Sequence, residues 1–191
     1  MQPLDVLSFW YDSTPEQPSQ KAQMGWWKKD ADFDQGIRER FGATWEQAKS
    51  GALNHWSATP KGRLALIIVL DQFSRNLHRG SPLTWAQDPM ALEQTLAALD
   101  AGEDKLLAMY GRLFLYMPLE HAEDVAMQER SLACFQAMNN EFGGQKNLVD
   151  YAEQHAAIVL RFGRFPHRNE VIGRESSAEE LAFLKEPGSS F

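Results

Sequence analysis

The chain has 191 residues, 43% of them apolar, and is therefore long enough to bury one substantial hydrophobic core. Nineteen basic residues stand against 26 acidic ones, which gives a net charge of −7 and a sequence pI near 5.2. Domains that bind nucleic acid are usually basic, so this balance argues against nucleic acid as a partner. We expect a single domain over residues 1–191.

Three features predict a soluble, cytoplasmic protein. The N-terminus has no basic start, Asp5 interrupts its apolar stretch, and no small-residue cleavage site follows, so we predict no signal peptide. The longest apolar run, residues 64–70, is far shorter than the ~20 residues that a membrane-spanning helix needs. Cys134 is the only cysteine and cannot form an internal disulfide, which is typical of a reducing compartment.

Helix signals begin at the N-terminus. Gln2-Pro3 opens a predicted helix that closes at residues 12–15. Residues 16–23, rich in Gln, Ser and Pro, predict a loop. Asp30 is a favourable N-cap for a long helix whose apolar residues are spaced three and four apart, with Gly51 just past its end.

A continuous apolar run follows the helix-start signal Thr59-Pro60. Periodicity alone does not distinguish a buried helix from a buried strand over residues 64–70. We predict a helix, because the run continues through residues 71–73 without a turn signal. Asp88-Pro89 begins the next predicted helix, which extends to Gly102.

The second half of the chain has the same character. Residues 105–117 and 119–138 predict two helices separated by a break at Pro118, because an interior proline forfeits a backbone hydrogen bond. Residues 148–162 predict another helix, and Ser177 to Glu180 is a capping-box start for a short C-terminal helix. Since no strand-like alternation appears, we predict an all-α fold of about nine helices. No tetratricopeptide repeat signature recurs.

Three polar segments interrupt the apolar pattern, and their residues form the candidate site. The first contains Asp71, Arg75 and Asn76, and the i, i+4 spacing puts Asp71 and Arg75 on one helix face. A purely structural explanation is an internal ion pair with a helix C-cap at Asn76. The functional explanation is that Asp71 orients Arg75 toward a ligand.

The second segment contains Glu120, His121, Glu123 and Asp124. Acidic groups at a helix start complement the helix dipole, which is a sufficient structural reason for them, and we expect Glu123 to be solvated. No His-x-x-x-His or Glu-x-x-His pair is present, so a metal would need ligands from distant segments. We predict no metal and no cofactor.

The third segment is the most basic part of the chain. Residues 161–174 contain four arginines and one glutamate, a net charge of +3. The side chains that carry its chemistry are Arg161, Arg164, His167, Arg168 and Asn169. Arginine alternating with phenylalanine suits recognition of carboxylate or phosphate. The structural alternative is that Arg161 and Arg164 neutralise the acidic segment around Glu120 and Asp124.

Ordered motifs along the whole chain resemble one known family. They are Leu7-Ser-Phe-Trp10, Trp26-Trp27, residues 70–76, residues 114–121, residues 161–169 and Gly173-Arg-Glu-Ser176. The sequence thereby resembles DUF 924, a bacterial family of unknown function. The resemblance implies an all-helical, tetratricopeptide-like right-handed superhelix. It implies no established activity, cofactor or catalytic residues.

The leading hypothesis is that the three polar segments converge on one concave pocket that binds an anionic small molecule or an acidic peptide end. Arg75, Arg164 and Arg168 would clamp the anion, with Asp71 and Asn169 orienting them.

Two alternatives remain open. An enzyme would use His121 or His167 as base, with Glu120 or Asp124 as its orienter, on an anionic substrate. A helical-repeat scaffold would bind a protein partner in a groove. The sequence does not define the oligomeric state.

Overall fold

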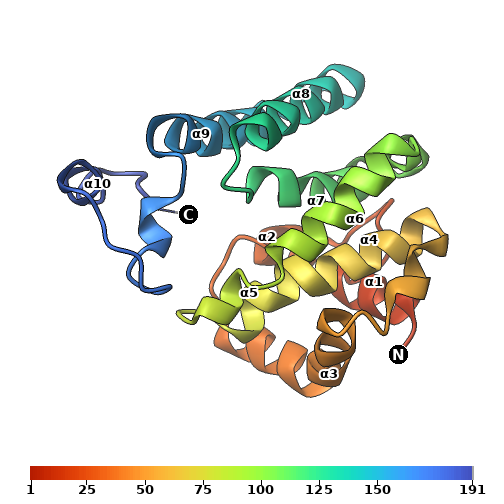
Figure 1. Ribbon diagram of the computed structural model, residues 1–191. Helices are drawn as coiled ribbons and strands as arrows, with labels where there is room; N and C mark the ends of the chain where they lie inside the picture. The colour runs from red at the N-terminus through yellow and green to blue at the C-terminus, as the bar shows by residue number, and fades with distance from the viewer. Residues whose placement is uncertain (191) are drawn as a thin grey trace. The chain divides into compact units, whose positions relative to one another are not determined.

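The computed structural model describes residues 1–190. Every regular element in that range is a helix, which confirms the predicted all-α class (Figure 1). The chain divides into two compact units: unit 1 comprises residues 1–79 and 83–118, and unit 2 comprises residues 80–82 and those from Leu119 onward. The single domain and the tetratricopeptide-like superhelix stay predictions. No helix within residues 1–190 is long and apolar enough to cross a membrane.

Unit 1 contains the first six helices and most of the seventh. They are α1 (Pro3–Tyr11), α2 (Gln20–Gly25), α3 (Ala31–Lys49), α4 (Pro60–Ile68), α5 (Ser74–Leu77), α6 (Asp88–Asp100) and α7 (Met109–Glu120). Asp30 caps α3 as predicted, because its Oδ1 accepts from the N–H of Phe33 at 3.0 Å. The loop predicted for residues 16–23 is wrong in its second half, since Ser19 Oγ accepts from Ala22 N–H at 3.0 Å and starts α2.

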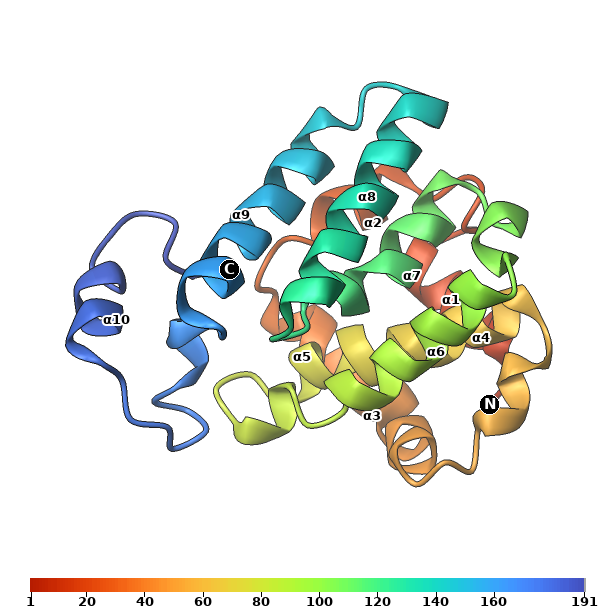
Figure 2. The same ribbon diagram turned by 45° about the horizontal axis from the view of Figure 1, so that its top comes forward.

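Helix α4 is the central element of unit 1 and packs against α1 and α6 (Figures 1 and 2). All residues from Leu64 to Val69 are fully buried, which accounts for the continuous apolar run. The predicted helix continues past α4 as a π-helical turn, Val69–Phe73, and then as α5. The choice of helix over strand is therefore confirmed.

The π-helical turn leaves backbone carbonyls without their usual α-helical donors, and two side chains supply replacements. Ser74 Oγ donates to Leu70 O at 2.5 Å, and the same hydroxyl accepts from Trp45 Nε1 at 2.7 Å. Arg75 Nη1 donates to Asp71 O at 2.9 Å. The polar residues after the apolar run are thus part of how this turn is stabilised.

Helix α7 continues through Pro118 to Glu120, so the predicted break at Pro118 is wrong. Pro118 lacks the N–H that would donate to the carbonyl of Phe114, so one helical bond is lost, yet the helix extends two residues beyond it. The chain leaves the helix after Glu120 instead. There Gln128 Nε2 donates to the carbonyls of Glu120 and Ala122 at 2.8 and 2.7 Å, and Asp124 Oδ1 caps the next helix at Met127 N–H.

Unit 2 is built from a helix pair and a short C-terminal helix. Helices α8 (Val125–Phe142) and α9 (Lys146–Phe162) lie side by side and antiparallel (Figures 1 and 2). Gly163, with φ +70°, ends α9 in the left-handed conformation that favours glycine. A loop with a 3₁₀ turn at Pro166–Arg168 then leads to α10 (Ala178–Phe183), which starts with the predicted capping box of Ser177 and Glu180.

Candidate functional site

The first polar segment lies in unit 1, in and just after the π-helical turn. The carboxylate of Asp71 is fully buried and lies 3.0 Å from Arg75 Nη1. Arg75 also makes two bonds to the carboxylate of Asp88, at 2.9 and 3.1 Å. Burial alone would lower the pKa of Arg75, but the charges of Asp71 and Asp88 raise it above its usual value. The anticipated ion pair is present, with Asp88 as a second carboxylate.

Asn76 does not cap α5, so that part of the structural explanation is wrong. The C-cap of α5 is His78, and Asn76 Nδ2 instead donates to Asp34 Oδ1 on α3 at 2.6 Å. Arg79 Nε bonds to the other oxygen of Asp34 at 2.6 Å. Asp34 thereby ties the end of the α4–α5 segment to α3, which gives Asn76 a structural role.

In unit 2, Arg161 and Arg164 pair with α10. Arg161 Nε lies 2.9 Å from Glu179 Oε1, and Arg164 makes two bonds to the carboxylate of Glu180, at 2.6 and 2.8 Å. The expected pairing with Glu120 and Asp124 is wrong, because the loop after Gly163 returns α10 to the end of α9. The hydrogen bond from Arg164 lowers the pKa of Glu180 to about 2.

Glu123 is half-buried rather than solvated, so that expectation is also wrong. Its carboxylate accepts from Phe165 N–H at 2.8 Å and from Arg174 Nη2 at 2.8 Å. Burial alone would raise the pKa of Glu123, but the bonds from Arg174 and Phe165 outweigh it and lower that pKa. Arg174, at the far end of the basic segment, therefore forms an ion pair with the acidic segment.

Four side chains from the two segments, together with His155 of α9, form what we call the buried cluster. They are Glu120, His121, His155, Phe165 and Arg168, with exposed fractions of 5%, 8%, 7%, 0% and 7%. Glu120 Oε1 lies 2.9 Å from His155 Nδ1, and the same nitrogen lies 2.9 Å from Tyr151 O. Two acceptors around one nitrogen fix the tautomer that carries the proton on Nδ1, so Nε2 of a neutral His155 is the basic nitrogen.

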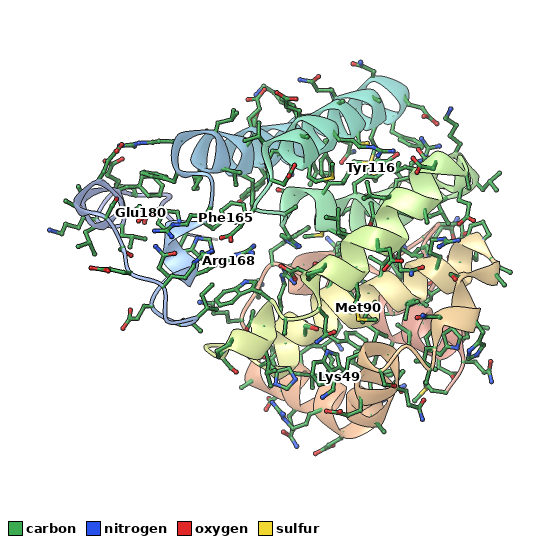
Figure 3. The ribbon with its side chains drawn as sticks, viewed as in Figure 1. Lys49, Met90, Tyr116, Phe165, Arg168 and Glu180 are labelled. Carbon is green, nitrogen blue, oxygen red and sulfur yellow. The ribbon has the colours of Figure 1, made fainter. Side chains whose placement is uncertain are left out.

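Phe165 is the centre of the buried cluster. Its ring centroid lies 5.7 Å from that of His155, and the guanidinium of Arg168 lies 4.5 Å above the ring (Figure 3). Arg168 Nη2 also donates to His121 O at 3.0 Å, and the His121 and His155 ring centroids are 6.3 Å apart. An imidazole and a guanidinium thus lie against one aromatic ring, and the carboxylate of Glu120 lies beside that imidazole.

The remaining predicted residues surround this cluster. His167 lies 5.6 Å from Phe165 between ring centroids, and burial, with the charges of Arg168 and His155, lowers its pKa to about 4. Asn169 is fully buried, donates to Ser176 Oγ at 2.9 Å and accepts from Arg174 Nε at 2.9 Å. Asp124 serves as the cap of α8.

The second and third polar segments therefore meet within unit 2. The first segment belongs to unit 1, so the convergence of all three on one pocket stays a prediction. Sequence reasoning left His155 out of the site, although a signal was present. His155 lies on the buried face of α9 with Ala152 and Val159, three and four residues away, and a histidine on an apolar helix face is necessarily buried.

The buried cluster has the parts of an acid–base site. A carboxylate that holds Nδ1 of an imidazole is the usual way to orient a catalytic or ligand-binding histidine. Within residues 1–190, no three His, Cys, Asp or Glu side chains are grouped so that they could hold a metal ion.

The fold and these contacts define an all-α protein with a buried Glu–His–Arg cluster. Residues 6–188 match the family model described as "Bacterial protein of unknown function (DUF924)". The chain therefore belongs to the DUF924 family, which confirms the resemblance of its motifs. It is also similar to a solved structure, a protein of unknown function, ATU0120, from Agrobacterium tumefaciens, with 36% identity, 96% of both chains covered and a TM-score of 0.83. No curated protein matches the chain.

Proposed function

We propose that the protein binds an anionic small molecule at the buried cluster. The supporting observation is that Glu120, His121, His155 and Arg168 are all buried within one small unit. Burial of such groups carries a desolvation cost, and apolar residues of similar volume often stabilise a fold as well or better. A ligand explains their presence better than stability does.

The guanidinium of Arg168 is the group of the cluster that favours an anion, because it suits bidentate recognition of carboxylate or phosphate. The other three arginines of residues 161–174 pair with glutamates, so the net charge of +3 in that stretch is offset in the fold. The other predicted partner is an acidic peptide end, and an acidic segment of the chain itself already occupies two of the arginines that would bind it. Glu179 and Glu180 of α10 already bind Arg161 and Arg164, so we favour a small molecule over a peptide.

A thermal-melt screen of the full chain against carboxylates, phosphorylated metabolites and nucleotides tests this proposal. A ligand at a hundred times its Kd stabilises by about 2.7 kcal/mol, and each kcal/mol raises Tm by about 2–4 °C at this size. Arg168→Gln should abolish the shift. Arg161→Gln is the matched control, because Arg161 is exposed and pairs with Glu179, and should keep it. No shift with any anion, or a shift that survives Arg168→Gln, contradicts the proposal.

A second candidate function is acid–base catalysis on the bound anion. The 2.9 Å contact between Glu120 and His155 favours it, with His155 as the base in place of His121 or His167. His167 is neutral at pH 7, because burial and neighbouring charges lower its pKa. It therefore provides a second proton acceptor beside His155.

Conversion of a ligand found by the screen, followed by NMR, separates binding from catalysis. His155→Gln should abolish turnover and leave the melting shift in place, whereas Glu120→Gln should slow turnover by about 10²-fold or more, since oriented general bases contribute about 10²–10⁴-fold. Turnover that is unchanged in His155→Gln rules out this base.

The proposal also includes a cytoplasmic location and the absence of nucleic acid as a partner. The single cysteine supports the first, and the net charge of −7 supports the second. The helical-repeat scaffold stays a prediction that a partner recovered by pull-down would favour.

A further inference from the structure

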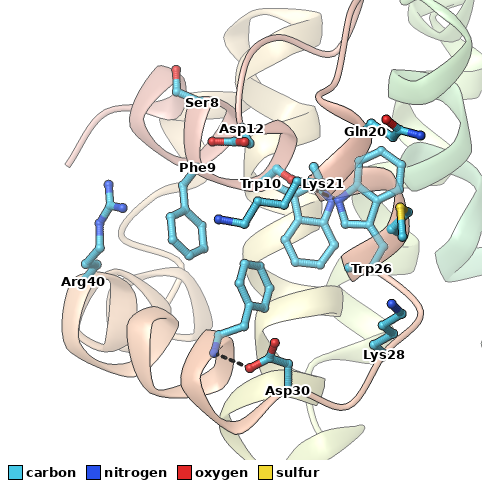
Figure 4. Close-up of a pocket in the computed structure, with 14 residues that line it drawn as sticks. Ser8, Phe9, Trp10, Asp12, Gln20, Lys21, Trp26, Lys28, Asp30 and Arg40 are labelled. Atoms are coloured by element: carbon cyan, nitrogen blue, oxygen red, sulfur yellow. Dashed lines mark hydrogen bonds between the residues drawn. The ribbon is translucent and has the colours of Figure 1, made fainter.

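A second candidate site lies in unit 1, well separated in the sequence from the buried cluster. A cleft of about 870 Å³ opens between α1, α2 and the start of α3 (Figure 4). This volume is within the range of sites that hold small organic molecules. None of the residues predicted to bind a ligand lines it.

Aromatic rings form the wall of the cleft. The rings of Phe9 and Phe33 are nearly parallel, with centroids 5.3 Å apart and an interplanar angle of 10°. Trp10 and Trp26 also stack, with centroids 6.4 Å apart at 15°. An aromatic wall of this kind favours a flat apolar ligand, because ring systems gain most contact area when they stack or meet edge to face.

Three cations surround these rings. Lys21, Lys28 and Arg40 line the cleft, and within residues 1–190 none of them forms an ion pair (Figure 4). The guanidinium of Arg40 lies 4.7 Å above the ring of Phe9, so its contact is with an aromatic ring rather than with a carboxylate.

The two carboxylates that line the cleft have other roles. Asp12 accepts from Ser19 Oγ at 2.9 Å, and Asp30 caps α3. The lining therefore carries three cations against two committed carboxylates, in a chain whose net charge is −7. Cationic groups beside an apolar wall are complementary to a molecule that is apolar at one end and negative at the other.

We propose that this cleft binds an aromatic carboxylate, with the ring system against Phe9, Trp26 and Phe33 and the carboxylate toward Lys21 and Lys28. The rings supply most of the contact area, and the lysines select the anion over a neutral molecule of the same shape. This site is independent of the function proposed for the buried cluster.

Isothermal titration of the full chain with 2-naphthoate tests the inference, with 2-naphthylmethanol as the neutral molecule of the same shape. We expect 2-naphthoate to bind at least about tenfold more tightly than the alcohol, and added salt to reduce the difference. Decanoate tests the flat ring, and we expect it to bind more weakly than 2-naphthoate.

Two lysine variants give a matched comparison. Lys21→Gln with Lys28→Gln should weaken 2-naphthoate binding by about tenfold or more, whereas Lys29→Gln removes a neighbouring charge outside the cleft and should leave it unchanged. These lysines are exposed, so circular dichroism should show that the variants fold. The inference would be overturned if 2-naphthoate did not bind at about 1 mM, or if the alcohol bound equally well or decanoate bound more tightly. It would also be overturned if Lys29→Gln weakened binding as much as the change of Lys21 and Lys28.

Discussion

His167 lies in an environment that opposes its charged form. Burial and the nearby charges of Arg168 and His155 lower its pKa from 6.5 to about 4. Between these values the unfolded chain binds a proton that the folded chain does not. The imidazole therefore reduces the free energy of unfolding as the pH falls from 6.5 to 4 and has no such effect above 6.5.

We predict that this residue makes unit 2 sensitive to acid. Between pH 7 and pH 5, the wild type should lose about 2 kcal/mol more stability than His167→Gln. The reason is that the unfolded chain binds a proton below pH 6.5 that the folded chain does not, which lowers the free energy of unfolding by about 1.4 kcal/mol per pH unit. Urea unfolding at the two pH values measures the difference. His55→Gln is the control, because it replaces an exposed histidine of unit 1 that lies outside the environment of His167. Equal losses in wild type and His167→Gln would contradict the prediction.

Single residues also show what sequence reasoning captured at the site and what it lacked. The second and third segments, singled out for their Arg, His and Glu, contribute four of the five residues of the cluster, whereas His155 lies outside both. The sequence did not predict which side chains pair, because pairing depends on how α9, the loop after it and α10 pack together. For this reason Glu123, predicted to be solvated, forms an ion pair with Arg174, and Arg161 and Arg164 pair with glutamates of α10.

At the scale of elements, the helix starts were the most predictable features. Asp30, Thr59 and Ser177 were recognisable because a capping side chain bonds within its own helix, and that requires only local sequence. The errors concern features that depend on tertiary structure. Trp45 of α3 donates to Ser74, which directly follows the π-helical turn at Val69–Phe73, and α7 continues for two residues past Pro118 although one helical bond is lost there.

The π-helical turn should depend on a single hydroxyl. Ser74 is fully buried, and Ser74→Ala removes the donor to Leu70 O and the acceptor of Trp45 Nε1. Leaving both partners unsatisfied should cost about 2–4 kcal/mol of stability, measured by chemical unfolding. Ser50→Ala is the control, because Ser50 is exposed and should change stability by less than about 0.5 kcal/mol. A Ser74→Ala variant as stable as this control would show that the hydroxyl does not stabilise the turn.

Helix α10 should depend on Glu180 more than on Glu179. Glu180 is buried and both caps α10 and binds Arg164 twice, whereas the Arg161–Glu179 pair is exposed on both sides. Exposed pairs are worth about 0.2–1 kcal/mol, while charged hydrogen bonds at a buried carboxylate are roughly twice as strong as neutral ones.

Amide hydrogen exchange in α10 measures this difference. Glu180→Gln keeps the capping box and loses the charge, so protection of α10 should fall well below that in Glu179→Gln. Glu180→Ala loses both contributions and should lower it further. The same protection in both glutamine variants would show that the buried pair does not hold α10.

For the whole molecule, the division into two units raises the question whether the chain unfolds as one cooperative domain, as the single-domain prediction implies. Unit 1 buries the rings of Trp10, Phe41 and Phe73, whereas unit 2 has its own core of Ile158, Val159 and Phe165. Length and apolar content predict that enough apolar surface is buried to form a core. They do not predict whether that surface forms one core or two, or how many cooperative units unfold. Helix α7 contributes residues to both units and is the continuous element that could couple their unfolding.

We predict that the two units open separately in native-state hydrogen exchange. Ser74→Ala lies in unit 1, so amides of α4 should lose about 30-fold or more of their protection, as its expected cost implies. Amides of α8 and α9 should keep theirs, because both helices belong to unit 2 and Ser74 belongs to unit 1. If α4, α8 and α9 lose protection equally, the units unfold together, α7 couples them, and the chain is a single cooperative domain as its length and composition predict.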